Sequence, residues 1–226
     1  MQRPWQTIEI RDCGEPLVSL PSSLFRWNPH PYAVLGAPYS AGTSPFQLRQ
    51  AVLLRLLKAQ TLLPCRLLIF DAWRPIAVQK YMVEWSLAQP GADPAAVDAL
   101  WAPPSSDPLT PPPHSTGSAV DLCLAGPDAE PLEMGGPIDS TGAIAEPNHF
   151  CSAAAGTKEY QWHSNRQLLA RAMARVGFCQ HPHEWWHFSY GDQMWAWHCG
   201  KPRALYAAAP CPCSKLRSKS GSNELQ

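Results

Sequence analysis

Two short stretches of the chain, about sixty residues apart, place the strongest constraint on how it can fold. The first runs from His114 to Asp121 and the second from Glu184 to His187. Two imidazoles and a carboxylate, with a fourth position left open, are a ligand set that typically holds a catalytic zinc ion. The remaining carboxylate, on Glu184, suits a general base that acts on an attacking water. A zinc hydrolase with His114, Asp121 and His187 as ligands is therefore the working hypothesis, which requires the fold to bring the two stretches together.

The first stretch also allows an explanation without a metal. His114 follows three prolines, residues 111–113, so the backbone before it is held extended. Asp121 lies within an apolar segment typical of a buried strand, and a buried carboxylate needs a charged or hydrogen-bonding partner. A metal ion would supply that partner, and so would a salt bridge with an arginine such as Arg66 or Arg74.

The second stretch poses a geometric problem. Glu184 and His187 are three residues apart, which places them on one face of a helix but on nearly opposite faces of a strand. The aromatic residues between them, Trp185 and Trp186, favour a strand. Both side chains can reach one metal only if Glu184 lies at a bend where the strand begins, and the His-Pro-His segment 181–183 can supply that bend. The alternative is an aromatic core strand with an incidental histidine, and the spacing alone leaves both open.

Length and composition favour one globular domain. The chain has 226 residues, of which 45% are hydrophobic, and we expect a single domain over residues 1–206 followed by a disordered tail over residues 207–226. The formal net charge is zero, which argues against a nucleic-acid partner and favours a small-molecule or peptide substrate. Eight scattered cysteines without Cys-x-x-Cys pairs argue against a structural zinc ribbon.

The cellular setting is predicted from what the sequence lacks. No apolar run reaches the length of a membrane-spanning helix, so no membrane association is expected. The N-terminus has no charged segment followed by an apolar segment and a cleavage site, so a cytoplasmic location is expected. The sequence does not indicate an oligomeric state.

Hydrophobic periodicity and turn residues predict an α+β fold with a small antiparallel or mixed sheet and flanking helices. Helices are predicted over residues 44–63, 76–88 and 165–177, with a further helical turn over 95–101. Strands are predicted over residues 66–70, 119–124, 185–190 and 194–198, the last two forming a hairpin through residues 191–193.

The motifs resemble those of the zinc-dependent D-alanyl-D-alanine dipeptidases, the vancomycin-resistance type within the D,D-peptidase/hedgehog-like superfamily. The pattern of that family is a His, a Gly three residues later, an Asp seven residues after the His, and a distant Glu-x-Trp-His. This sequence matches it with His114, Gly117, Asp121, Glu184, Trp186 and His187. Two further family segments are similar to residues 71–75, Asp-Ala-Trp-Arg-Pro, and to Met134 and Gly135 followed by Asp139. The similarity runs from about Ile8 to Trp197.

The resemblance implies a hedgehog/D,D-peptidase-like fold, one Zn²⁺ per chain and a role for each matched residue. His114, Asp121 and His187 would bind the zinc, and Glu184 would take a proton from the attacking water and pass it to the leaving amine. The oxyanion would be stabilised by Arg74, for which an ion pair with Asp71 is the alternative role. The free ammonium group of the substrate would face Asp139, and Tyr32 is a further candidate for the same pocket.

The implied activity is that of a metalloprotease that hydrolyses the dipeptide D-Ala-D-Ala to two D-alanines, in the turnover or recycling of peptidoglycan precursors for the cell wall. Two alternatives are a D,D-carboxypeptidase that acts on longer wall peptides and a non-catalytic, zinc-containing hedgehog-like binding module. One departure concerns residues 111–113, where resistance-type members have a serine that helps to hold the substrate. Recognition of one end of the dipeptide is therefore expected to differ.

Overall fold

A five-stranded mixed sheet forms the centre of the computed structural model, which describes residues 3–39 and 44–210. The strand order is β3-β5-β6-β8-β7, in which β3 and β5 run parallel and all other neighbours run antiparallel. These findings confirm the predicted α+β fold with its small mixed sheet and flanking helices. In the order given, the strands are Phe25–Arg26, Arg66–Asp71, Ala119–Ala125, His187–Ser189 and Cys179–Gln180.

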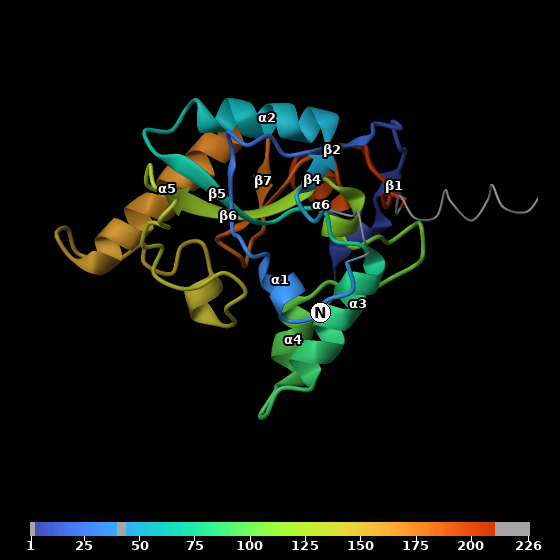
Figure 1. Cartoon of the computed structure of the whole chain (residues 1–226), viewed down its shortest axis with the longest axis horizontal. Coiled ribbons are helices and arrows are strands. Elements are labelled where there is room, and N and C mark those ends of the chain that lie inside the picture. Colours follow the sequence, from blue (N-terminus) through green and yellow to red (C-terminus); the bar gives the residue numbers. More distant parts are fainter. Residues whose placement is uncertain (1–2, 40–43, 211–226) are drawn as a thin grey trace, which may run out of the picture.

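Helices lie on both sides of this sheet (Figure 1). Apolar side chains of α2 (Gln50–Gln60) and α5 (Lys158–Arg175) pack with those of the sheet strands in the largest core cluster. A second cluster joins α1 (Pro31–Val34) and α3 (Ile76–Leu87), and the end of α4 (Pro94–Leu100) packs against it. Asp121 on β6 and His187 on β8, two of the three predicted metal ligands, lie near the ends of these central strands.

Short elements connect the ends of the chain to this core. The N-terminal arm contains the 3₁₀ helix η1 and strand β1, which pairs in parallel with β9 near the other end of the described chain. Strands β2 and β4 form a separate antiparallel pair. The bounds of these and the remaining short elements are η1 Pro4–Thr7, β1 Glu9–Ile10, β2 Leu17–Ser19, β4 Gln47–Arg49, η2 Pro113–Thr116, η3 Ala143–Ala145, α6 Gln193–His198 and β9 Arg203–Ala204.

Two predicted elements are wrong. The helix predicted from residue 44 begins only at Gln50, because the preceding residues pair with β2 as strand β4. The second strand of the predicted hairpin, residues 194–198, is the helix α6. The side chain of Asp192 accepts a hydrogen bond from the backbone N–H of Trp195 and so caps this helix, and the cap outweighs the strand preference of the aromatic residues that follow.

The other predicted elements are present with shifted ends. The helix predicted from residue 165 starts earlier, at Lys158, where the hydroxyl of Thr157 caps it. Residues 207–210 still contact the domain, since the N–H of Ala209 donates to the carbonyl of Ser115, and residues 211–226 of the predicted tail lie outside the described residues. The six cysteines within the described residues are free thiols. Among the described residues, no helix has both the length and the apolar character needed to span a membrane.

Candidate active site

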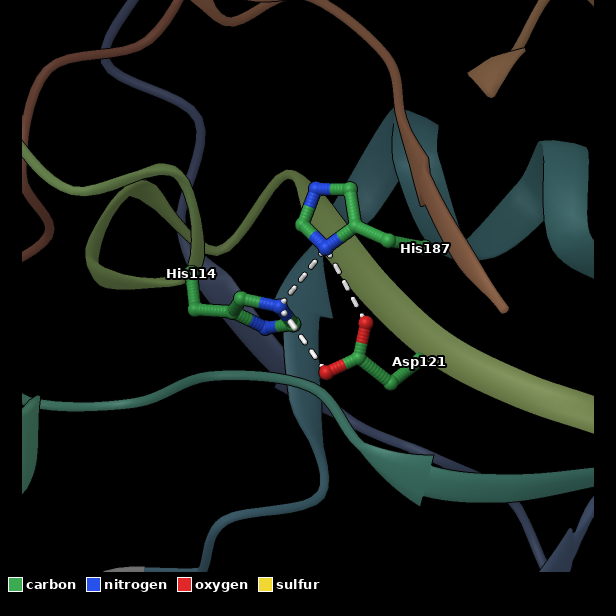
Figure 2. A group of neighbouring side chains, drawn as sticks. All are labelled: His114, Asp121 and His187. Atoms are coloured by element: carbon green, nitrogen blue, oxygen red, sulfur yellow. Dashed lines mark hydrogen bonds and ion pairs between the residues drawn. The ribbon is translucent and has the colours of Figure 1, made fainter. Parts of the chain in front are cut away.

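His114, Asp121 and His187 point toward one another (Figure 2), as the working hypothesis requires. Nε2 of His114 lies 3.2 Å from Nδ1 of His187 and 3.2 Å from Oδ2 of Asp121. Nδ1 of His187 lies 3.0 Å from Oδ1 of Asp121. All three side chains are buried, and the three potential ligand atoms lie within 4.8 Å of one another.

Strand register and one glycine turn place these three residues. Asp121 on β6 is the direct cross-strand partner of His187 on β8, so both side chains leave neighbouring strands at the same level. His114 lies on η2, which Gly117 ends with a φ of 73°. A Cβ at Gly117 would lie 2.2 Å from a methyl carbon of Leu17, so both the turn and the close packing require glycine there.

The protonation pattern fits a divalent metal ion. Nδ1 of His114 donates to the carbonyl oxygen of Ala72 at 2.7 Å, so in the neutral form of the ring the lone pair lies on Nε2 and faces Asp121 and His187. Burial alone would raise the pKa of Asp121, but the two histidines hold it well below its usual range. Two imidazole nitrogens and one ionised carboxylate are a donor set that divalent metals bind.

Glu184 lies at the predicted bend, just before β8. Its Oε2 is 3.8 Å from Nδ1 of His187, and its Oε1 is 3.7 Å from Nδ1 of His181. The next residue, Trp185, donates its backbone N–H to the carbonyl of Ala145 and fixes the bend. Burial, reinforced by the nearby carboxylates of Asp121 and Asp139, raises the pKa of Glu184 well above its usual value.

Arg74 lies beside the three metal-ligand candidates. It forms ion pairs with both Asp71 and Asp121, the two carboxylates that the sequence offered as its partners. Its Nη2 is 2.7 Å from Oδ2 of Asp71 and 3.4 Å from Oδ2 of Asp121. Nη1 donates to Gln79 at 2.9 Å, so the guanidinium group is held on two sides. Arg66, the other arginine considered for Asp121, instead donates to a backbone carbonyl away from the site.

Asp139 and Tyr32 are hydrogen-bonded to each other next to Arg74. The hydroxyl of Tyr32 donates to Oδ2 of Asp139 at 2.8 Å, and Nη2 of Arg74 lies 3.2 Å from the same hydroxyl. Asp139 has a φ of 62°, which is uncommon for a residue other than glycine. Burial and the charge of Asp121 raise the pKa of Asp139 to about 7, against the opposing effect of Arg74.

Several supporting residues were not predicted as site residues. Asp71 is fully buried and receives both Arg74 and His30, whose Nε2 is 3.0 Å from Oδ1. Arg166 on α5 is buried and donates to three backbone carbonyls of the segment that carries Asp139.

One cleft with an empty volume of about 830 Å³, open solvent included, contains the predicted metal ligands and most of their neighbours. Glu184, Arg74 and Asp139 line it together with His114, Asp121 and His187, whereas Tyr32 reaches it through Asp139 and Arg74. Other walls come from the N-terminal arm, the end of α4, residues 110–113 and α6. The cleft thus brings together three candidate metal ligands, a candidate base and a fixed cation, which are groups that can hydrolyse a carbonyl bond.

Comparisons with known proteins identify the family of the chain. The family described as D-ala-D-ala dipeptidase matches residues 47–205 of the chain. The chain belongs to this family. Its members are metallopeptidases, so the chain is a hydrolase, and the predicted family is confirmed.

Two relatives carry the same description. The D-alanyl-D-alanine dipeptidase of Synechocystis sp. is 41% identical over 222 residues, which cover 86% of this chain and 90% of that protein. The D-alanyl-D-alanine dipeptidase of Enterococcus faecalis is 35% identical over 81 residues, which cover 35% of this chain and 37% of that protein. A solved structure of the LD-carboxypeptidase LdcB aligns with 82% of this chain and 70% of its own, at a TM-score of 0.43 and 16% identity.

Proposed function

We propose that this protein is a zinc-dependent dipeptidase that hydrolyses D-Ala-D-Ala to two D-alanines, in the turnover or recycling of peptidoglycan precursors. The observation that carries the proposal is the convergence of His114, Asp121 and His187 in one cleft with Glu184 and Arg74. The 41% identity to the Synechocystis D-alanyl-D-alanine dipeptidase supports the choice of substrate.

One zinc ion per chain would be held by His114, Asp121 and His187. Bound there, zinc would act as a Lewis acid on the peptide carbonyl and would lower the pKa of water. Glu184 takes a proton from the attacking water and transfers it to the leaving amine. The burial that raises the pKa of Glu184 lets this carboxyl hold the proton between the two steps.

Arg74 stabilises the negative charge that develops on the carbonyl oxygen during attack. Its guanidinium is already fixed by Asp71 and Gln79, so little reorganisation is needed when the charge appears. The ion pair between Arg74 and Asp71 is therefore compatible with the catalytic role, because Asp71 holds the cation in place.

Asp139 binds the free ammonium group of the dipeptide, and the hydroxyl of Tyr32 orients the carboxylate that does so. A substrate acylated at its amino end would lack this charge and would bury the carboxylate of Asp139 without a positive charge from the substrate to pair with it. This feature favours a dipeptidase over a D,D-carboxypeptidase. The presence of Glu184 and Arg74 in the cleft favours an enzyme over a binding module, which needs neither.

The test is the release of D-alanine from zinc-loaded protein, with free D-Ala-D-Ala compared with the same dipeptide acylated at its amino end. Turnover of the free dipeptide alone is the expected result, lost on chelation and restored by added zinc. Turnover of the acylated form would instead indicate a carboxypeptidase. If neither is cleaved while zinc stays bound, the binding module becomes the correct description.

A further inference from the structure

The N-terminal arm forms part of the cleft wall, although it precedes the residues that the family matches, 47–205. Arg3 and Trp5 both line the cleft. Nε2 of Gln193 donates to the carbonyl of Ile8 at 2.7 Å, and the ring of Trp5 packs edge-on against that of His181 with 6.1 Å between centroids. The arm is thus held against the site by contacts with both α6 and the bend before β8.

The charges of the cleft leave one end of a dipeptide without a partner. A free dipeptide carries an ammonium group at one end and a carboxylate at the other. Asp121, Asp139 and Glu184 give the cleft carboxylates, which suit the ammonium end and repel the other. Arg74 is already engaged, with Nε and Nη2 on Asp71 and the rest of the guanidinium on neighbouring side chains. The carboxylate end therefore needs another cation.

The proline-rich wall cannot supply hydrogen bonds for that carboxylate. Pro111, Pro112 and Pro113 line the cleft and have no backbone N–H. The hydroxyl of Thr110 next to them lies 3.0 Å from the hydroxyl of Ser105, so it already has a partner. This wall shapes the cleft and offers little for an anion to bind.

Arg3 is a cation of the cleft whose guanidinium still has donors that are not engaged. Among the lysines and arginines of residues 3–39 and 44–210, only Arg3 and Arg74 line the cleft. Nη2 of Arg3 donates to the carbonyls of Asp98 and Trp101, at 2.8 and 2.9 Å, which anchors the side chain at the end of α4. Its Nη1 comes no closer than 3.9 Å to the carboxylate of Asp98, and neither Nη1 nor Nε donates a hydrogen bond within the described ranges.

Arg3 also lies on the side of the cleft that the reaction chemistry requires. Arg3 and Glu184 line the same cleft, and the charges of the two side chains interact; in the proposed function, Glu184 delivers the proton to the leaving amine. In a dipeptide, this amine and the terminal carboxylate belong to the same amino acid and are separated by one carbon atom. A cation close to Glu184 is therefore close to the carboxylate of the leaving residue.

We propose that Arg3 binds the terminal carboxylate of the substrate through Nε and Nη1, while Nη2 stays anchored at the end of α4. The inference rests on the proposed function and extends it to the substrate class: short peptides in which both termini are free, with Asp139 at one end and Arg3 at the other. A planar guanidinium pairs well with a carboxylate because two parallel N–H donors meet two oxygens.

The test compares Arg3→Gln with the wild-type enzyme on two substrates, D-Ala-D-Ala and its carboxyl-terminal amide, which lacks the negative charge. Loss of a charge-assisted hydrogen bond predicts a rise in KM of about 10- to 100-fold for the free dipeptide. The KM for the amide, or its Ki as a competitor if turnover is slow, should change by less than about two-fold, because no carboxylate is present. Arg3→Lys keeps the charge and should recover part of the loss for the free dipeptide alone.

Arg11→Gln is the matched control, since Arg11 is an exposed arginine of the same arm that does not line the cleft. If KM of Arg3→Gln rises equally for both substrates, Arg3 only supports the arm. If KM and kcat are unchanged for both substrates, Arg3 does not contact the substrate. Either result overturns the inference. If the proposed function itself is wrong, the result differs from both of these, because the wild-type protein then releases no D-alanine from the free dipeptide.

Discussion

The metal side and the substrate side of the cleft are built in different ways. On the metal side, Asp121 pairs across the sheet with His187 on one neighbouring strand and with Asp71 on the other. The substrate side consists of segments with only short elements of regular structure, the N-terminal arm with Arg3 and residues 134–146 with Asp139. In the proposed function, two of the metal ligands, Asp121 and His187, are therefore placed by strand register, whereas recognition rests on loops held by individual side chains.

This difference indicates which side of the cleft can vary in sequence between relatives. Residues within a sheet keep their positions because both backbone neighbours pair with them, and a shift by one residue would reverse every side chain. Loops accept changes in sequence and length more readily. We therefore expect relatives of this chain to share the metal side and to differ in the residues that select the ends of the substrate.

The largest effect is expected on the metal side, where Glu184→Gln should separate metal binding from catalysis. Glutamine keeps the size of the side chain but cannot accept a proton, so kcat should fall by about 10²- to 10⁴-fold while zinc content stays at one per chain. Zinc content by elemental analysis and D-alanine release are the two measurements. Asp121→Asn is the control, which should lose zinc and activity together. Loss of zinc from Glu184→Gln would make Glu184 a ligand and would remove it as the base.

The metal ligands could be proposed from the sequence because each of the two stretches is local, but the spacing alone left an explanation without a metal open, and the resemblance to the dipeptidases gave each residue its role. His114 and Asp121 are joined by a turn that needs glycine at one position, and Gly117 is there with a φ of 73°. Glu184 and His187 required a bend at residues 181–183, and the structure has it. The α+β fold followed from the order of the predicted helices and strands, which are partly segregated along the chain.

On the substrate side, Asp139 and Tyr32 were proposed from the family resemblance alone, and the other contacts could not be predicted because they join distant parts of the chain. Arg3 meets the end of α4 at Trp101, and no local pattern marks that pairing. For Arg166 a signal was present, since it lies on the same buried stripe of α5 as Leu169 and Met173. A charged residue at such a position needs polar partners, and here they are backbone carbonyls.

An intermediate effect on activity is expected from Asp139, which binds the ammonium group of the substrate in the proposed function. Asp139→Asn should raise the KM for free D-Ala-D-Ala by about 10- to 100-fold, because a charge-assisted hydrogen bond is lost. The expected kcat is close to that of the wild type, since Asp139 takes no part in bond cleavage. This result would separate recognition from chemistry, whereas a fall in kcat with unchanged KM would place Asp139 on the metal side.

The pH dependence of the same variant sharpens the assignment. The pKa of Asp139 is raised to about 7, so its carboxyl is mostly neutral at lower pH and cannot form an ion pair with the ammonium group. The KM of the wild-type enzyme should therefore rise as the pH falls below about 7 and should level off at higher pH. Asp139→Asn should lack this rise. A rise that persists in the variant would have to come from another group.

The smallest effect on activity is expected from Arg166, which never meets the substrate. Its guanidinium donates to the carbonyls of Met134, Ile144 and Glu146 at 2.7 to 3.0 Å and so fixes both ends of the segment that carries Asp139. Arg166→Lys keeps the charge but loses the planar guanidinium with its several N–H donors. KM for D-Ala-D-Ala should therefore rise by about three-fold, equivalent to about 0.6 kcal/mol. The free energy of unfolding in urea should fall by about 1–3 kcal/mol, because buried carbonyls lose their partners.

Zinc content and kcat of Arg166→Lys should stay within about two-fold of the wild type, because strand register holds the metal side independently of this segment. The separation of KM from kcat distinguishes a positioning role from general destabilisation, which would lower the fraction of active enzyme and leave KM unchanged. Arg171→Lys, on a solvent-exposed position of α5, is the control and should change neither quantity. If Arg166→Lys loses zinc as well, the two sides of the cleft depend on each other, and the distinction between register and loops does not hold.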